Sequence, residues 1–336
     1  MRYDPWLHRF ALFTAVNTFV LIFLGGLVTS TGSGLSVPDW PTTYGENMFT
    51  FPIDKWVGGI KYEHGHRLFA SYVGLLTTVL AVWLGLKAQR PWLKRAGYSA
   101  LVLVIVQGIL GGLTVLYLLP TPVSVAHGMT AQSFLCLVSI IALGTSSWWT
   151  TTTSARDSEA LRTMSLVMTA ASAVIFVQLA LGALLRHTYS GLSVPDFPLA
   201  YGQLFPSLDA DALASYQQQL LDDRLKFPGD RPVQAYQIVI HMLHRSWAYI
   251  AAAVLLAAGT MLRKGRRRLE GFERHGALLI GAVLIQFTLG ALTVLSRKEI
   301  LITTAHVAVG AATLVVCVVT AVQLHRLRRL AQGGMR

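Results

Sequence analysis

The chain has 336 residues, of which 53% are hydrophobic and only 13% are charged. Its mean hydropathy of +0.52 excludes an ordinary soluble globule. Lys and Arg number 28 against 16 Asp and Glu, which gives a net charge of +12. The basic residues stand between long apolar runs, without any RNP, zinc-finger or basic-helix pattern. The charge is therefore typical of membrane loops, and nucleic acid is not an expected partner.

Eight apolar runs come near or exceed the roughly 20 residues that a helix needs to cross a bilayer. In chain order they cover residues 6–28, 68–86, 96–119, 123–146, 161–185, 238–261, 275–295 and 301–324. The first run is too long for a signal-peptide core, so we expect a retained anchor. Pro120 and Pro122 separate the third span from the fourth and predict a tight hairpin. The expected fold class is an all-α integral membrane protein with eight transmembrane helices.

The distribution of basic residues predicts the orientation of these spans. Both termini share one side with three connecting loops, and that side carries 18 of the 28 Lys and Arg. A basic cluster at 263–268 directly follows the sixth span. Because cytoplasmic loops collect Lys and Arg, we expect both termini in the cytoplasm. The two long loops, 29–67 and 186–240, then lie outside, and the second should contain a short surface helix at 209–224.

The chain is internally duplicated. The segment LGGLVTSTGSGLSVPDWPTTYG (Leu24–Gly45) recurs at Leu181–Gly202 with 14 of 22 positions identical, at an offset of 157. Gln107–Leu116 likewise matches Gln286–Leu295 at an offset of 179. These matches predict two homologous four-helix bundles, which insert with the same orientation and form a parallel repeat. The predicted halves are residues 1–150 and 155–336.

The repeated GLSVPD-x-P loop combines turn-forming glycines with prolines and an aspartate that can cap backbone amides. We therefore expect a rigid lid over the outer end of each half. Asp39 and Trp40 in the first loop, with Asp196 and Phe197 in the second, are expected to be structural.

Four of the ten histidines obey the repeat. His66 pairs with His244 at an offset of 178, and His127 pairs with His306 at an offset of 179. They lie at the outer ends of the second, fourth, sixth and eighth spans, at matched depth. A single histidine on a helix is more often an interhelical hydrogen bonder, but two rings at one height across a bundle are the arrangement for axial ligands of heme iron. Zinc fits poorly, because it takes three or four ligands around one ion.

Glu63 breaks the symmetry between the halves. It lies three residues before His66, on the same face of a helix, and its counterpart in the second half is His241. A carboxylate beside a heme could act as a base or stabilise a developing cation. The alternative is a helix-start residue favoured by the macrodipole.

Arg67 and Arg245 directly follow two of the histidines, at the aqueous edge. They are expected either to contact heme propionates or to anchor the helices at the interface. No role follows from the sequence for three further histidines, His64, His187 and His241.

The combination of GSGLSVPDWP after the first span, E-x-x-H-R opening the second and A-H opening the fourth, repeated in the second half, resembles the heme A synthase family. The resemblance covers essentially the whole chain. It implies a membrane oxidoreductase that converts heme O to heme A for cytochrome oxidase, oxidising the C8 methyl to a formyl group by successive hydroxylations.

The resemblance also implies roles for individual residues. His244 and His306 would ligate a heme b cofactor through which electrons leave. His66 and His127 would hold the substrate heme O, with Glu63 as the catalytic carboxylate. One departure concerns cysteines, because some members carry a pair in the first outer loop, about where Val37 and Thr43 stand here. A thiol-dependent handover of electrons or heme is thereby in doubt, and the assignment survives because cysteine-free members exist.

Two other classes of protein stay open. A diheme b-type electron-transfer cytochrome would hold two permanent, identical hemes and would not need Glu63. A transporter or heme exporter would carry ionisable residues near mid-membrane, whereas nearly all of them lie at the boundaries here.

The expected location is the plasma (inner) membrane, with the heme sites towards the extracytoplasmic side. The expected partners are membrane lipid, heme O and the farnesyltransferase that makes heme O. The sequence leaves open the electron acceptor, the source of the inserted oxygen and the oligomeric state, a homo-oligomer included.

Overall fold

The computed structural model describes residues 3–153, 159–225, 231–264 and 271–333. Over these residues the chain is helical, with two isolated β-bridges in loops, and the expected all-α class is confirmed. Eight of the described helices are long and apolar enough to cross a membrane. They are α1 (Pro5–Ser30), α2 (Ile60–Lys87), α3 (Pro91–Leu116), α4 (Thr121–Thr145), α6 (Glu159–His187), α8 (Ala235–Lys264), α9 (Glu273–Leu295) and α10 (Ile300–Gly333).

Shorter elements lie between these helices. They are the helices α5 (Ser147–Thr151) and α7 (Ala210–Asp222) and the 3₁₀ turns η1 (Ile53–Lys55) and η2 (Ser190–Leu192). The expected surface helix at 209–224 is α7, which begins where the Asp209 side chain accepts a hydrogen bond from the Ala212 amide at 2.8 Å. Residues 265–268 of the basic cluster lie outside the described residues.

Local sequence signals explain several of the helix ends. α1 begins at Pro5, and the Asp4 carboxylate caps the amides of Trp6 and Leu7. Pro120 precedes α4 and closes the expected hairpin with α3. The expected start of the second span at residue 68 was wrong, because α2 begins at Ile60. Its first two turns are polar, so hydropathy alone misses them.

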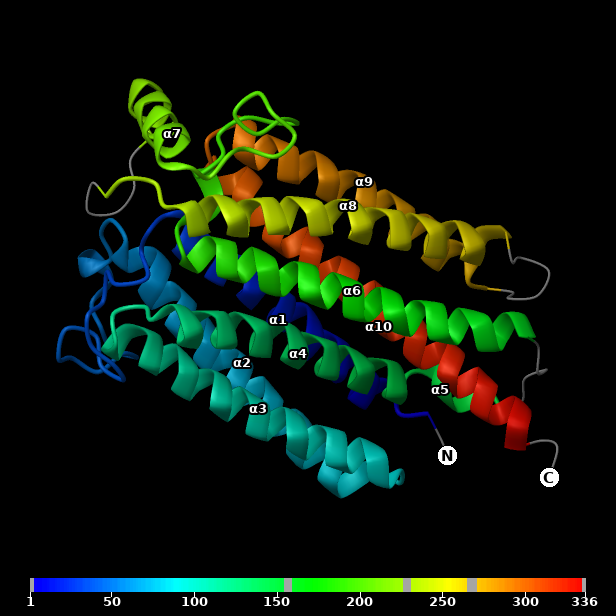
Figure 1. Cartoon of the computed structure of the whole chain (residues 1–336). Coiled ribbons are helices and arrows are strands. Elements are labelled where there is room, and N and C mark those ends of the chain that lie inside the picture. Colours follow the sequence, from blue (N-terminus) through cyan, green and yellow to red (C-terminus); the bar gives the residue numbers. More distant parts are fainter. Residues whose placement is uncertain (1–2, 154–158, 226–230, 265–270, 334–336) are drawn as a thin grey trace.

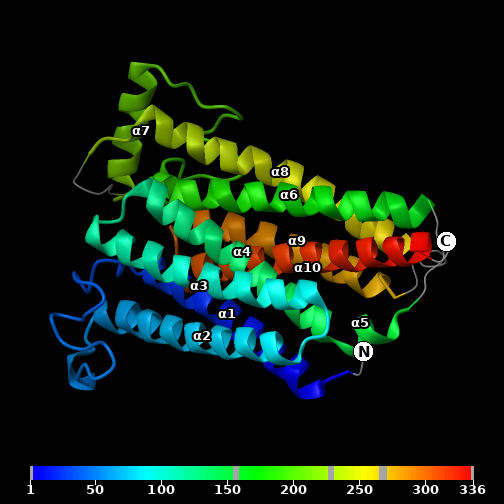
Figure 2. The same cartoon turned by 90° about the horizontal axis from the view of Figure 1, so that it is seen from below.

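Each half is a four-helix ring. In the first half α1 packs on α2, α2 on α3, α3 on α4 and α4 on α1; in the second half α6, α8, α9 and α10 pack in the same order (Figure 1). Consequently α2 and α4 face each other diagonally, as do α8 and α10. The halves meet through α1 against α10, α4 against α6 and α4 against α10, and Figure 2 shows α10 lying between the two groups of helices.

The two halves have largely separate cores. One cluster of buried apolar side chains is built mainly from α6, α8, α9 and α10, and the other mainly from α1, α2, α3 and α4. The exceptions lie on the interface helices, since Cys136 of α4 belongs to the first of these clusters and Ala311 of α10 to the second. The division into domains at residues 150 and 155 stays a prediction.

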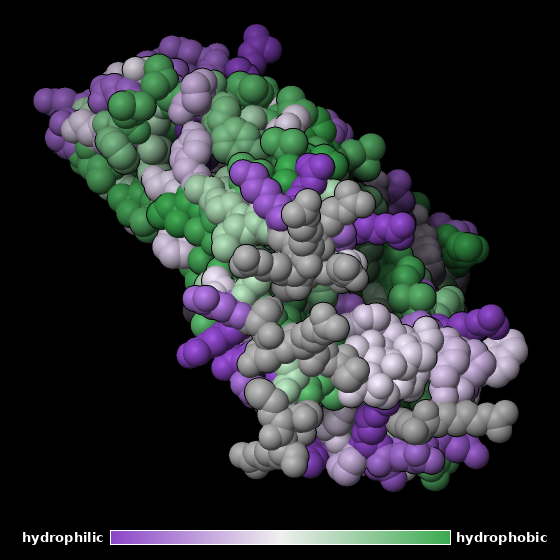
Figure 3. All heavy atoms as spheres, turned by 90° about the vertical axis from the view of Figure 1, so that its right-hand side faces the viewer, coloured by the Kyte–Doolittle hydropathy of each residue, from purple (hydrophilic) through white to green (hydrophobic). Residues whose placement is uncertain are grey.

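The start of α1 and the end of α10 lie at one end of the bundle, and both long loops with α7 lie at the other, which we call the loop end (Figure 1). Figure 3 looks onto the end that carries the chain termini, where hydrophilic side chains are spread over the surface and hydrophobic ones follow along the flank. This distribution is the one expected for a bundle whose sides contact lipid.

Candidate functional site

The four repeat-related histidines all lie in the part of the bundle nearest the loop end. His66 and His127 are on the diagonal helices α2 and α4, and His244 and His306 are on the diagonal helices α8 and α10. All four side chains are half-buried. Within each pair the rings lie close enough for a charge on one to act on the other. Each half thus presents two imidazoles towards its own interior.

Each of these rings packs against a glycine of the adjoining helix. A Cβ built on the glycine would stand only 3.2 Å from His66 at Gly25, 3.3 Å from His127 at Gly111, 3.1 Å from His244 at Gly182 and 3.1 Å from His306 at Gly290. These glycines come from α1, α3, α6 and α9, the helices that do not carry the histidines. We therefore find the same histidine-on-glycine arrangement four times, twice in each half.

The sequence analysis assigned these glycines no role beside the histidines. The sequence did contain a signal for this role. Gly25 and Gly182 are 157 residues apart, and Gly111 and Gly290 are 179 apart, which are the offsets that define the duplication.

The residues fit an iron-bound heme in each half. The Nδ1 atoms of His127 and His306 are buried without a hydrogen-bond partner among the described residues. The glycines form cradles that a Cβ would fill. Among the residues that the structure describes, no cluster of three or more His, Cys, Asp or Glu side chains is placed to hold a metal ion. Pairs of imidazoles suit axial ligation of heme better than a tetrahedral zinc site.

Glutamine side chains support two of the histidines. Gln107 donates from Nε2 to the backbone carbonyl of His127 at 2.9 Å. The Gln178 amide lies 3.3 Å from Nδ1 of His244 and 3.3 Å from its backbone carbonyl. These contacts fix the helices on either side of the rings.

Glu63 is buried beside His66, with only 4% of its surface exposed. Its Oε2 accepts a hydrogen bond from the Val37 amide at 2.8 Å, and its Oε1 pairs with the Arg67 guanidinium at 2.6 Å. Removing one partner of such a buried pair leaves the other charge uncompensated. The contacts with Val37 and Arg67 hold this carboxylate in one position, between α2 and the first outer loop.

The second half has no carboxylate at the equivalent place. His241 is 2% exposed, and its Nδ1 lies 3.0 Å from the Ser190 carbonyl. The difference between the halves that the sequence predicts is thus present in three dimensions.

Arg67 and Arg245 hold the two outer loops. Arg67 donates to the carbonyls of Val37, Asp39 and Thr42 at 2.8, 2.7 and 3.1 Å. Arg245 donates to the carbonyls at the repeat-related positions, Val194, Asp196 and Leu199. Both guanidinium groups are therefore loop anchors in this structure, and their contact with heme propionates stays a prediction.

The loops themselves share one hydrogen-bonding plan. Asp39 accepts from the amides of Tyr44 and Gly45, both at 2.8 Å, and from the Thr42 hydroxyl. Partial burial of Asp39 tends to raise its pKa, but these hydrogen bonds outweigh it and keep the pKa below its ordinary value of 3.8. Asp196 accepts in the same way from the amides of Tyr201 and Gly202. A structural role for both aspartates agrees with these contacts.

One side chain of the first loop reaches the histidine site of its half. A Cβ on Gly112 would stand 2.6 Å from the Trp40 indole, and the preceding Gly111 is the residue under His127. In the second half the corresponding pair is Phe197 and Ala291. The larger ring thus occurs with the smaller helix residue, and in the second half the Phe197 ring lies 6.1 Å from that of Phe287 on α9.

His64, for which the sequence indicated no role, fastens the same loop. It is fully buried, bonds the Thr43 hydroxyl through Nδ1 at 3.0 Å and packs against Trp56 and Phe51 with ring centroids 4.6 and 5.2 Å away. Its place is therefore in the packing of the lid.

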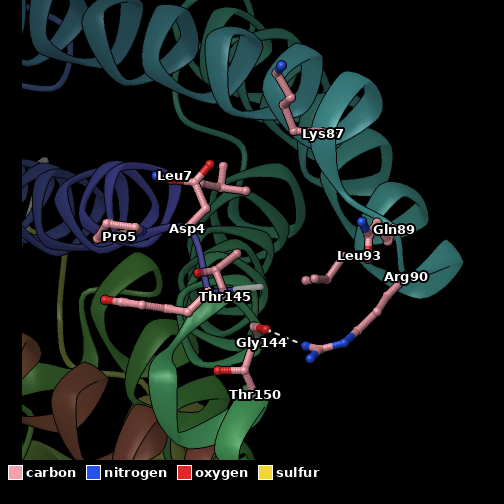
Figure 4. Close-up of a pocket in the computed structure, with 11 residues that line it drawn as sticks. Asp4, Pro5, Leu7, Lys87, Gln89, Arg90, Leu93, Gly144, Thr145 and Thr150 are labelled. Carbon is pink, nitrogen blue, oxygen red and sulfur yellow. Dashed lines mark hydrogen bonds between the residues drawn. The ribbon is translucent and has the colours of Figure 1, made fainter. Parts of the chain in front are cut away.

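A cavity of about 320 Å³ lies at the other end of the molecule, between the start of α1, the α2–α3 connection and the end of α4 (Figure 4). Arg90 on its wall donates to the Gly144 carbonyl at 2.9 Å. None of the four repeat-related histidines lines this cavity. It is separate from the two histidine sites.

Comparison with known proteins agrees with this architecture. The protein named Heme A synthase of Sphingopyxis alaskensis is 27% identical over 361 residues, covering 96% of this chain and 92% of its relative. The one of Shewanella oneidensis is 27% identical over 336 residues, covering 94% of each chain. The one of Alkalihalophilus pseudofirmus is 29% identical over 212 residues, covering 62% of this chain and 68% of its relative.

A family assignment follows from a match that covers nearly all the transmembrane helices. Residues 8–58 and 52–318 match the COX15-CtaA family, described as cytochrome oxidase assembly protein. Together with the eight apolar helices, this match identifies an integral, multi-pass membrane protein. The chain belongs to the COX15-CtaA family of cytochrome oxidase assembly proteins.

Proposed function

We propose that this protein is a heme A synthase, an oxidoreductase that converts the C8 methyl of heme O to a formyl group. The substrate heme binds in the first half between His66 and His127. A heme b cofactor binds in the second half between His244 and His306. The names of its relatives support the reaction, and the duplicated histidine–glycine arrangement supports two heme sites.

The observation that carries this proposal is Glu63. Two equivalent electron-transfer hemes would not need different surroundings, yet one half has a buried carboxylate where the other has His241. The Val37 amide and Arg67 hold that carboxylate in a fixed position. This asymmetry favours a catalytic half and a cofactor half over a diheme electron-transfer cytochrome.

The chemistry assigned to Glu63 follows from the weakness of the methyl group as an acid. A fixed negative charge stabilises positive charge that develops on a carbon during its oxidation, and it can accept the proton released afterwards. Trp40 of the first loop packs against Gly112, the residue after the glycine under His127. Heme b, when bound, supplies a one-electron acceptor for the electrons that leave the substrate.

The proposal also includes the position of the two hemes in the membrane. The histidines lie near the starts of α2, α4, α8 and α10. These helix starts are at the loop end, opposite the end that carries the chain termini (Figure 1). The excess of Lys and Arg at the end with the chain termini favours a cytoplasmic position for that end. In the proposal, both hemes then lie near the extracytoplasmic face of the plasma membrane. A physical association with heme O synthase fits a substrate that is poorly soluble in water.

The proposal is tested by expressing the chain with and without a heme O-producing farnesyltransferase, extracting the noncovalent hemes and separating them by reversed-phase chromatography with mass detection. We expect heme A or its hydroxylated precursor only when the transferase is present. Heme b alone in both samples, at two per chain, would instead support the electron-transfer cytochrome.

A further inference from the structure

The last turn of α6 carries two residues that the duplication does not account for. Arg186 and His187 stand where the first half has Thr29 and Ser30. A third unmatched residue is Lys298, in the loop between α9 and α10, whose counterpart is Leu119. Arg297 in the same loop is unmatched as well, but it pairs with Asp223. Arg186 and Lys298 are therefore cations near the loop end of the second half that the first half lacks.

Arg186 lies where the two halves meet. Its Nη2 donates to the Gly26 carbonyl at 2.9 Å and to the Ser30 hydroxyl at 2.5 Å, both on α1. The Thr304 hydroxyl donates to the same Ser30 oxygen at 3.0 Å. Thr304 precedes His306 by two residues on α10. Arg186 is thus linked through one hydroxyl to the helix turn that carries an axial-ligand candidate.

Lys298 belongs to the same group. Its side chain passes Gly191, just after α6, where a Cβ would stand 3.6 Å from the lysine Cδ. Arg186 is close enough to act electrostatically on both Lys298 and His306. In the described part of the chain, neither cation forms an ion pair with a carboxylate.

Two neighbouring cations without an anion form a receptor for one. A guanidinium binds a carboxylate through two N–H groups, and among the described residues the hydrogen bonds of Arg186 use its Nη2 alone. Arg67 and Arg245 are engaged by their loops, as described above. Arg186 therefore remains available close to His306, with Lys298 next to it.

We propose that Arg186, together with Lys298, binds a propionate carboxylate of the heme held between His244 and His306. This inference rests on the heme site of the second half, which is part of the proposed function, and is independent of the methyl oxidation. Positive charge beside a heme favours its reduced form, because reduction lowers the charge of the iron. The first half has Thr29 and Leu119 in place of Arg186 and Lys298, so it lacks this positive charge beside its heme. The cofactor heme is thereby the stronger electron acceptor of the two.

The test uses the full-length chain loaded with heme b, expressed without a source of heme O. We expect Arg186→Gln and Lys298→Gln each to lower the midpoint potential of the second-half heme, while the absorption spectrum still reports two histidine ligands. Transfer of that heme to apomyoglobin should become about tenfold faster in Arg186→Gln, as expected for loss of one charge-assisted hydrogen bond. Arg186→Lys, which keeps the charge, should restore most of the potential.

Two controls separate charge from structure. Ser30→Ala removes the hydroxyl that Arg186 shares with Thr304 but leaves the cation, and it should keep the potential. Lys61→Gln removes an exposed charge at the loop end of α2 and should also have no effect. The inference is overturned if Arg186→Gln and Lys298→Gln both keep the wild-type potential, or if Ser30→Ala reproduces their shift. Failure of the chain to make heme A would refute the proposed reaction and leave this result intact.

Discussion

Glu63 shows how one residue can separate two homologous sites. It occupies the same place in its half as His241 in the other, one turn before an axial-ligand candidate. The Glu63 carboxylate accepts a hydrogen bond from the Val37 amide and pairs with Arg67, whereas the His241 imidazole bonds the Ser190 carbonyl. A buried carboxylate is thus present beside the histidine pair of one half only, and the proposed division of labour between the halves rests on this difference.

Replacing Glu63 by Gln should stop catalysis without unfolding the protein. The amide oxygen can still accept from Val37, so the loop contact survives, but the charge is lost. We expect production of heme A and of its hydroxylated precursor to fall by at least about 100-fold, the effect typical of removing one electrostatic catalytic group. Heme extraction from cells supplied with heme O measures this. Glu46→Gln, which changes an exposed carboxylate paired with Lys55, is the matched control; normal heme A from Glu63→Gln would remove Glu63 from the mechanism.

The glycines beneath the histidines give a second prediction at the same scale. Gly111→Val should displace the His127 ring, because even a Cβ at this position stands 3.3 Å from Cε1. The variant is expected to lose the heme of the first half and to keep that of the second. Gly108→Val on the same helix, where a Cβ meets nothing within 4 Å, serves as control. Heme content per chain distinguishes them, and equal content in both variants would contradict the arrangement.

The loops that follow α1 and α6 are the elements that cover the sites. Each is organised by an aspartate that accepts backbone amides and by an arginine that binds three carbonyls. In addition, Tyr44 and Tyr201 donate from their hydroxyls to the carbonyls of Ser36 and Ser193, both at 2.6 Å. The loop is therefore a preformed unit, and in the first half its position decides where the Val37 amide meets Glu63.

Asp39→Asn should loosen the first loop. The amide group cannot accept all the bonds that the carboxylate accepts, so we expect faster amide hydrogen exchange across residues 37–46, measured by mass spectrometry. Because the folded-state pKa of Asp39 lies below its ordinary value of 3.8, its contribution to stability is present above that value and is lost as the pH falls through the lowered one. Asp54→Asn in the same loop should leave exchange there unchanged. Unchanged exchange in Asp39→Asn as well would show that the carboxylate does not organise the loop.

At the scale of the whole molecule, the two bundles are joined through α1, α4, α6 and α10, and each has its own histidine pair. The unmatched residues Arg186 and Lys298 add positive charge to one of two otherwise similar sites. In the proposed function, one bundle holds the substrate heme and the other holds an electron-accepting heme, and this difference in charge would direct electrons towards the second bundle.

His306→Ala should separate the two sites experimentally. We expect the chain to lose the heme of the second half, to keep that of the first and to make no heme A, because its electrons then have no exit. His127→Ala should show the reciprocal loss. Pyridine hemochrome assays on the purified variants measure heme per chain, with His8→Ala, at the opposite end of the bundle, as control. Loss of both hemes from either variant would contradict independent sites.

Much of this protein is visible in its sequence. Hydropathy predicts the eight spans because lipid requires long apolar helices, and the duplication identifies four histidines and the exceptional Glu63 because these residues stand at fixed spacings. The start of α2 was misplaced for the same reason, since its polar turns carry no hydropathy signal.

Only the tertiary structure decides which residues meet. The contacts at the sites join segments that lie far apart in the chain. They include the glycines that pack under the histidine rings, the Val37 amide that donates to Glu63, the arginines that bind loop carbonyls, and Arg186 between the halves. Such contacts depend on the rotation of each helix about its axis and on the distance between neighbouring helices. The local composition and spacing of residues do not determine these two quantities. The residue types were therefore readable from the sequence, and their partners were set by packing.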